Sequence, residues 1–193
     1  MMLFLDTEFT GLDQGNPSLI SLALVKEDGD FFYAELPPAG YLHRADPWVR
    51  ENVLPLLWGG SYRMAPGELS AKLVAWIEAI ASDATIVTDS PEYDFEMMLK
   101  PLLDPWPVGL ARQALRFDSY AMGRDQQELL SKIMREYHGA ERPEHHALYD
   151  AFALREGLIA ARTAGWSPGP GWPTRSALGP GPIAGRQQMP QGK

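Results

Sequence analysis

Cysteine is absent from this chain of 193 residues. Its absence excludes a disulfide framework and any thiolate metal site, so a metal would have to be held by oxygen or imidazole ligands. Long apolar runs are also lacking: none approaches the ~20 residues of a membrane span, and the start has no charged segment followed by an apolar signal core. We therefore expect a cytoplasmic protein with no membrane partner.

Positive charge is scarce as well. The chain has 17 Lys and Arg against 25 Asp and Glu, which gives a net charge of -8 and an isoelectric point near 5.0. This balance argues against a protein that coats duplex nucleic acid electrostatically, but it permits a local basic groove. The most basic stretch lies in the middle of the chain and contains Arg112, Arg116, Arg124, Lys132, Arg135 and Arg142. A solvated helix face is a simpler explanation of these residues than a path for phosphates.

Apolar residues, which make up 45% of the chain, are enough for one substantial core. The last 27 residues, by contrast, contain six prolines and six glycines and too little apolar surface to offset the entropy of ordering. We predict one domain over residues 1–166, followed by a flexible tail over residues 167–193.

Strand-like and helix-like patterns alternate along the predicted domain, which is typical of an α/β fold. We expect strands where β-prone residues cluster, over 2–8, 18–25, 30–36, 84–88 and 114–117. We expect helices where apolar residues recur at helical spacing, over 46–56, 66–81, 93–103, 120–137 and 147–164. The Asp28-Gly29 pair between the second and third strands predicts a tight hairpin turn.

Acidic residues recur at the ends of these elements. The first strand is apolar but ends in Asp6-Thr7-Glu8, and alternation places Asp6 and Glu8 on one face while Thr7 points away. Asp94 opens a helix just after a strand, and Asp150 lies in the last helix, five residues after His145. Because buried carboxylates need a positive partner and the nearest Lys or Arg in sequence is Lys26, the pattern favours a bound divalent metal.

Three segments together resemble the DEDDh family of exonucleases, and they occur in the family's order. They are Asp6-Thr7-Glu8-Phe9-Thr10-Gly11-Leu12, Tyr93-Asp94-Phe95-Glu96-Met97-Met98-Leu99 and His145-His146-Ala147-Leu148-Tyr149-Asp150-Ala151. The resemblance covers residues 1–164. Within the family, residues 46–55 are most similar to bacterial polyadenylate-degrading exoribonucleases, with ribonuclease T and oligoribonuclease as further relatives.

The resemblance implies a ribonuclease H-like fold with a mixed central sheet of about five strands flanked by helices. It implies a 3′-to-5′ exonuclease that releases nucleoside 5′-monophosphates from single-stranded nucleic acid, RNA ahead of DNA, and it suggests a homodimer. Two Mg²⁺ or Mn²⁺ ions would be bound by Asp6, Glu8, Asp94 and Asp150, with His145 as the general base. The substrate-binding residues would be Thr7, Phe9, Thr10 and Leu12.

Two assignments have competitors within the sequence. The second motif usually follows an Asn, whereas Asp89-Ser90-Pro91-Glu92 fills that space here, so Asp89 competes with Asp94 as a ligand. His146 lies one helical turn before Asp150 and competes with His145 as the base. Other functions also stay open: a single-stranded DNA or proofreading exonuclease, a catalytically idle nucleic-acid-binding or adaptor module, and a phosphatase or nucleotide hydrolase.

Overall fold

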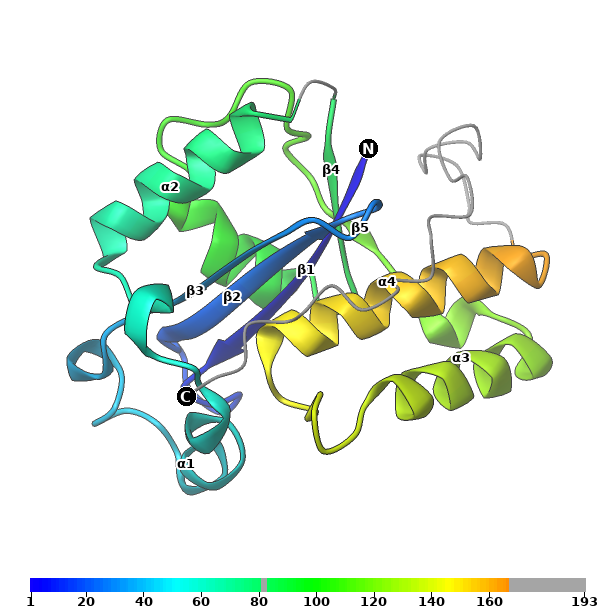
Figure 1. Cartoon of the computed structure of the whole chain (residues 1–193), viewed down its shortest axis with the longest axis horizontal. Coiled ribbons are helices and arrows are strands. Elements are labelled where there is room, and N and C mark those ends of the chain that lie inside the picture. The colour runs from blue at the N-terminus through cyan, green and yellow to red at the C-terminus, as the bar shows by residue number, and fades with distance from the viewer. Residues whose placement is uncertain (81–82, 167–193) are drawn as a thin grey trace.

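The computed structural model describes residues 1–80 and 83–166, and the predicted tail over 167–193 lies outside them. Its centre is a five-stranded sheet in the order β3-β2-β1-β4-β5 (Figure 1). β1 pairs antiparallel with β2, and β2 with β3, whereas β1, β4 and β5 run parallel. The strands are β1 (Met2–Phe9), β2 (Leu19–Lys26), β3 (Phe31–Glu35), β4 (Thr85–Thr88) and β5 (Leu115–Arg116). The α/β class and the mixed sheet of five strands are thereby confirmed.

Four α-helices accompany the sheet in the described residues: α1 (Pro47–Asn52), α2 (Pro66–Glu78), α3 (Arg124–Tyr137) and α4 (Ala147–Thr163). Short 3-10 turns lie at Pro38–Gly40, Leu54–Leu56, Gly60–Tyr62, Lys100–Leu102 and Ser119–Ala121. No helix in these parts of the chain is both long and apolar enough to cross a bilayer.

Several helices are shorter than their sequence patterns predicted. The helix expected over 46–56 ends at Asn52 and gives way to a 3-10 turn that contains Pro55. The helix expected from residue 120 begins only at Arg124, after Gly123, whose amide donates to the Gln126 side chain at 3.2 Å. The segment 93–103 is a π-helix over Glu92–Leu99 followed by a 3-10 turn. Apolar spacing alone did not distinguish these hydrogen-bond patterns from an α-helix.

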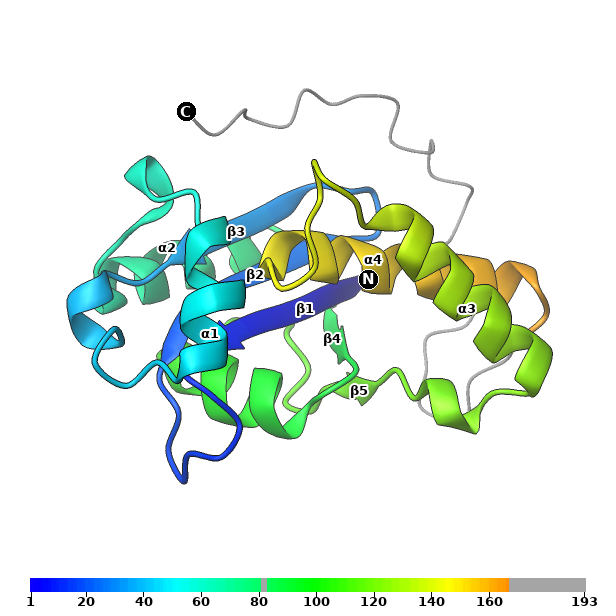
Figure 2. The same ribbon diagram turned by 90° about the horizontal axis from the view of Figure 1, so that it is seen from below.

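Helices cover both faces of the sheet, with α2 on one side and α4 on the other (Figures 1 and 2). α3 lies against the outer side of α4. Gly157 of α4 permits this close approach, because a β-carbon there would lie 2.3 Å from a methyl group of Leu130 on α3. α3 and α4 therefore pack closely as a pair. This packing brings the residues that follow α3 near Asp150 in the first turn of α4.

The side chains of β1 divide between the two layers as the sequence predicted. Leu3 and Leu5 belong to the core that includes α2 and the π-helix, and Met2 and Phe4 belong to the core that includes α4. The alternation continues to the end of the strand. Thr7 therefore points to the π-helix side, and the two acids that flank it point to the α4 side.

Glu35, at the end of β3, is fully buried and anchors the segment after the second 3-10 turn. Its carboxylate accepts hydrogen bonds from the amides of Trp58 (2.7 Å) and Gly59 (3.0 Å) and from the Tyr33 hydroxyl (2.9 Å). The Arg63 guanidinium lies 3.9 Å away. These contacts hold the Trp58 backbone at the end of β3. The Trp58 ring contacts the ring of His146, the residue just before α4.

We expect Glu35→Ala to destabilise the fold by roughly 3 kcal/mol or more, because three donors, two of them in buried hydrogen bonds, lose their acceptor. Urea unfolding followed by circular dichroism measures this change. Glu35→Gln keeps a carbonyl acceptor and should recover part of the loss, and the exposed Glu51→Ala is the matched control. A Glu35→Ala protein as stable as this control would contradict the anchoring role.

Candidate metal centre

Three carboxylates from the two ends of the domain meet at the carboxyl end of β1. Asp6 and Glu8 come from β1, and Asp150 comes from the first turn of α4. One oxygen from each lies within 4.8 Å of the others, and all three side chains are half-buried. Oxygens at such spacing suit a divalent cation, and the predicted ligands Asp6, Glu8 and Asp150 are thus brought together by the structure.

Asp94 lies beside this group but outside it. It is buried at the start of the π-helix, where Thr7 Oγ1 donates to its Oδ1 at 2.6 Å and Thr88 Oγ1 donates to its Oδ2. Its charge still raises the pKa values of Asp6 and Glu8, so it lies within electrostatic reach of the group. The two threonines hold the carboxylate in one orientation at the edge of the site.

Asp89, the competitor of Asp94, is exposed at the end of β4. Its charge raises the pKa values of Asp6, Asp94 and Asp150. It therefore adds a fifth negative charge to the site. The choice between Asp89 and Asp94 as a ligand stays a prediction.

Burial is the first cause of the raised pKa values throughout the cluster, and repulsion among the acids adds to it. Together they raise the pKa values of Asp6 and Glu8 well above the ordinary range and those of Asp94 and Asp150 to about 7. Within residues 1–80 and 83–166, no lysine or arginine is among the groups that counter these shifts. A bound divalent cation would lower this cost, because its charge would favour ionisation of all the acids together.

Asp150 is held from both sides by histidines. The His145 amide donates to its Oδ2 at 2.8 Å, and His138 Nε2 lies 3.3 Å from its Oδ1. His145 achieves this with a left-handed backbone, φ 65°, which is costly for a residue with a β-carbon. The unusual backbone therefore has an identified role, since it turns the amide toward the acid.

The His145 ring lies at the rim of the site. It is half-buried and packs edge-to-face against Trp48 of α1, with ring centroids 4.8 Å apart. α1 is in turn tied to the loop after β1, because the Asp46 amide donates to the Thr10 carbonyl at 3.0 Å. The candidate base is thus placed between α1 and α4, with its backbone against Asp150.

His146 instead belongs to the core. Its ring is 1% exposed and lies 4.8 Å from each of the rings of Tyr33, Trp58 and Tyr149, and neither of its nitrogens has a hydrogen-bond partner in the described residues. Burial lowers its pKa to about 4, which keeps it neutral near pH 7. His146, which competes with His145 by its helical spacing from Asp150, is thus enclosed by three aromatic rings.

The four predicted substrate-binding residues differ in exposure. Thr7 and Thr10 are buried, and their hydroxyls are engaged within the protein, Thr10 with the Gln14 side chain at 2.8 Å. Phe9 stacks on Tyr93, with centroids 5.5 Å apart, whereas Leu12 is 63% exposed. Direct contact with a substrate stays a prediction, and it suits Leu12 better than the two threonines.

The sequence analysis missed His138 entirely. It precedes Asp150 by twelve residues, and no periodic or motif spacing connects the two. The connection arises only because the chain reverses between α3 and α4 and returns the end of α3 to the start of α4. The contact of Trp48 with His145 was likewise not predicted from the sequence.

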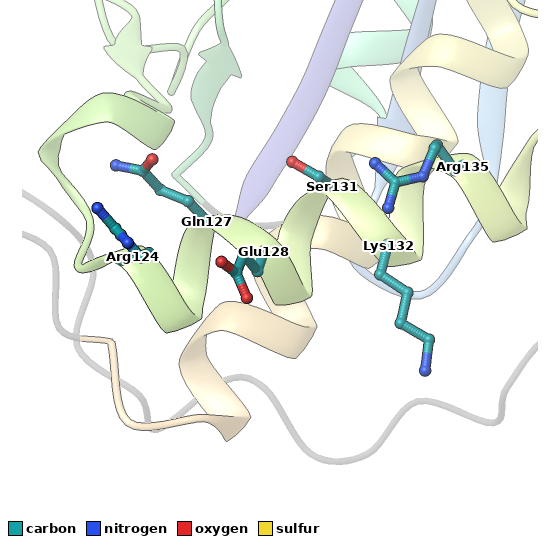
Figure 3. Close-up of a pocket in the computed structure, with 6 residues that line it drawn as sticks. All are labelled: Arg124, Gln127, Glu128, Ser131, Lys132 and Arg135. Atoms are coloured by element: carbon teal, nitrogen blue, oxygen red, sulfur yellow. The ribbon is translucent and has the colours of Figure 1, made fainter.

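A separate hollow of about 690 Å³ lies along one face of α3 (Figure 3). Its lining is polar and comes from one face of that helix: Arg124, Gln127, Glu128, Ser131, Lys132 and Arg135. It contains none of the residues of the candidate metal centre.

No protein-family model and no curated protein matches this chain. The chemistry of the site is therefore inferred from its own side chains. The grouping of Asp6, Glu8 and Asp150, with Asp94 beside them, is the feature that any function must explain.

We expect Asp150→Asn to stabilise the metal-free protein more at pH 8 than at pH 4. The folded-state pKa of Asp150 is raised from 3.8 to about 7, so its favourable contribution is present below pH 3.8 and is lost as the pH rises to about 7. The variant should gain on the order of 4 kcal/mol over the parent across that window, since each pKa unit corresponds to about 1.4 kcal/mol.

Thermal unfolding of both proteins in chelator, over a pH series, measures this difference. Because the titration of His146 is common to both chains, it cancels in the comparison. Saturating Mg²⁺ should remove most of the variant's advantage by neutralising the acids in the parent. A constant difference between the two proteins at all pH values would show that Asp150 is not raised in the folded state.

Proposed function

We propose that this chain is a metal-dependent 3′-to-5′ exonuclease of ribonuclease H-like fold that hydrolyses single-stranded RNA, in preference to DNA, to nucleoside 5′-monophosphates. The observation that carries the proposal is the meeting of Asp6, Glu8 and Asp150 from opposite ends of the sequence. The three motif resemblances and the mixed sheet support it.

The donor set fits a hard divalent metal, because it is made of carboxylates and contains no sulfur. Asp6, Glu8 and Asp150 would hold it, with Asp94 as the fourth ligand. Two Mg²⁺ or Mn²⁺ ions, when bound, would supply activation of the attacking water and stabilisation of the departing 3′ oxygen. Ionisation of the raised carboxyl groups accompanies binding, since a ligand must release its proton first.

His145 is the residue proposed to take the proton of the attacking water. Its ring is partly open to solvent at the rim, and imidazole is the side chain most often used as a general base. His146 is a poorer candidate because its ring is enclosed and has a lowered pKa. A modest movement of the 141–145 segment on substrate binding would bring the His145 ring toward the acids.

Two exposed apolar side chains at the site suit unpaired bases. Trp48 is 51% exposed beside His145, and Leu12 is 63% exposed on the loop that follows β1. Aromatic and apolar surfaces stack on or wedge between unpaired bases without requiring a particular sequence. Trp48 and Leu12 therefore support single-stranded nucleic acid as the substrate. The net charge of -8 disfavours binding along a long duplex and so supports recognition of a short strand end.

An idle binding module is less well supported. Burial and the charges of neighbouring acids raise the pKa values of Asp6 and Glu8, and groups perturbed in this way concentrate at functional sites. A phosphatase would use the same metals but would act on mononucleotides. Product analysis on end-labelled RNA, DNA, duplex and mononucleotide substrates, with Mg²⁺ and with chelator, separates these functions.

We expect the parent protein to shorten single-stranded RNA from its 3′ end in Mg²⁺ or Mn²⁺ and to lose this activity in chelator. Asp6→Asn should abolish turnover, because it removes a ligand charge with almost no change in volume. Circular dichroism should show that the variant is folded, and Asp13→Asn, on the exposed loop, is the matched control. Full turnover by folded Asp6→Asn would falsify the proposed mechanism.

We expect His145→Ala to lower kcat by roughly 10²–10⁴, the range for loss of a general base, with little change in the Mg²⁺ midpoint. His146→Phe should retain most activity, because its ring has only aromatic neighbours and no polar partner among the described residues. Single-turnover kinetics on labelled RNA compares the two. Equal losses in both variants, or a larger loss in His146→Phe, would reject His145 as the base.

A further inference from the structure

His138 is the one histidine whose ring directly approaches an acid of the cluster in the described residues. Its Nε2 lies 3.3 Å from Asp150 Oδ1, and its side chain is only 10% exposed. It lies outside the three motifs that carry the proposed function. No catalytic step described above uses it.

The His138 ring is fixed by the end of α3 and by the turn that follows. Its amide donates to the Met134 carbonyl at 3.1 Å, and its Nδ1 lies 3.3 Å from the Arg142 carbonyl. Gly139 and Arg142 exchange two backbone hydrogen bonds of 3.0 Å, which close the turn. The Arg142 guanidinium lies 4.3 Å from the Tyr137 ring centroid and covers the turn from outside.

As a result, both oxygens of Asp150 have a neighbour that can donate to them. Oδ2 accepts from the His145 amide, and Oδ1 faces His138 Nε2. An ionised carboxylate can only accept, so a hydrogen bond at this contact would require an N–H on His138 Nε2. Each oxygen keeps a second lone pair, which leaves the carboxylate able to bind a cation while its plane is held.

Asp94 shows the same arrangement by different means. Thr7 donates to one of its oxygens and Thr88 to the other. Both acids are thus held from two sides, one by hydroxyls and one by a backbone amide and an imidazole. This repeated pattern indicates that the orientation of each carboxylate is part of the site's construction.

We propose that His138 is a positioning residue for the metal centre, which orients Asp150 for divalent cation binding through the contact with Oδ1. The inference rests on the proposed metal-dependent function and adds a residue to its site. Hydrogen-bond partners of a ligand typically contribute 10–100-fold to metal affinity. Without His138, the Asp150 carboxylate would lose its imidazole neighbour at Oδ1 and would be held by the backbone amides of His145 and His146.

Titration calorimetry with Mn²⁺ alone, at one alkaline pH and without nucleic acid, tests this role. We expect His138→Leu to weaken Mn²⁺ binding by roughly 10–100-fold. His138→Gln, whose amide donates from a similar place, should recover most of the affinity. His43→Leu, at an exposed histidine, is the matched control and should bind as the parent does.

The same variants should differ in the Mn²⁺ dependence of RNA hydrolysis. The Mn²⁺ midpoint of His138→Leu should rise by the factor seen in calorimetry, and its rate at saturating Mn²⁺ should stay within a few-fold of the parent. Loss of rate at saturation with an unchanged midpoint would overturn the positioning role. So would parent-like or tighter Mn²⁺ binding by His138→Leu, or equal weakening in the Gln and Leu variants.

The proposed function can fail separately from this inference. A parent that binds Mn²⁺ but hydrolyses no RNA, with the expected Leu and Gln difference in affinity, would reject the nuclease and retain the positioning role. A parent that binds no Mn²⁺ would reject both. Circular dichroism on each variant shows whether a lost affinity reflects loss of the fold.

Discussion

Repulsion among partly buried carboxylates is the constraint on which this structure depends. Asp6 and Glu8 are held at the end of a central strand, and α4 brings Asp150 to within 4.8 Å of them. Burial and like charge both oppose ionisation there, so the pKa values rise. The apolar cores on the two faces of the sheet offset this cost, because they fix β1 and α4 independently of the acids.

Three consecutive residues connect the two layers of the protein. Thr7 faces the π-helix and donates to Asp94, while Asp6 and Glu8 face α4 and meet Asp150. The period of two in a β-strand is what allows neighbours in sequence to serve opposite faces. A shift of one residue in the register of β1 would therefore turn Thr7 away from Asp94 and turn Asp6 and Glu8 away from Asp150.

The sequence predicted what depends on local pattern and missed what depends on chain reversals. Alternation in β1 correctly placed Asp6, Thr7 and Glu8, and Asp28-Gly29 correctly marked a hairpin, where Gly29 has a positive φ of 91°. The aromatic cage of His146 was not predictable, because its rings come from β3, the 58–62 segment and α4. The contact of His138 with Asp150 likewise depends on how α3 and α4 pack. Metal binding and catalysis stay predictions that the fold permits.

The assembly of the site from the first strand and the last described helix also has a consequence for biosynthesis. A nascent chain that has emerged only as far as α2 carries Asp6 and Glu8 without Asp150, and closing so long a loop is entropically costly until the intervening sheet has formed. The cluster of Asp6, Glu8 and Asp150 therefore forms late in folding. A partly synthesised or partly unfolded chain would lack it, so whatever function this cluster serves depends on completion of the fold.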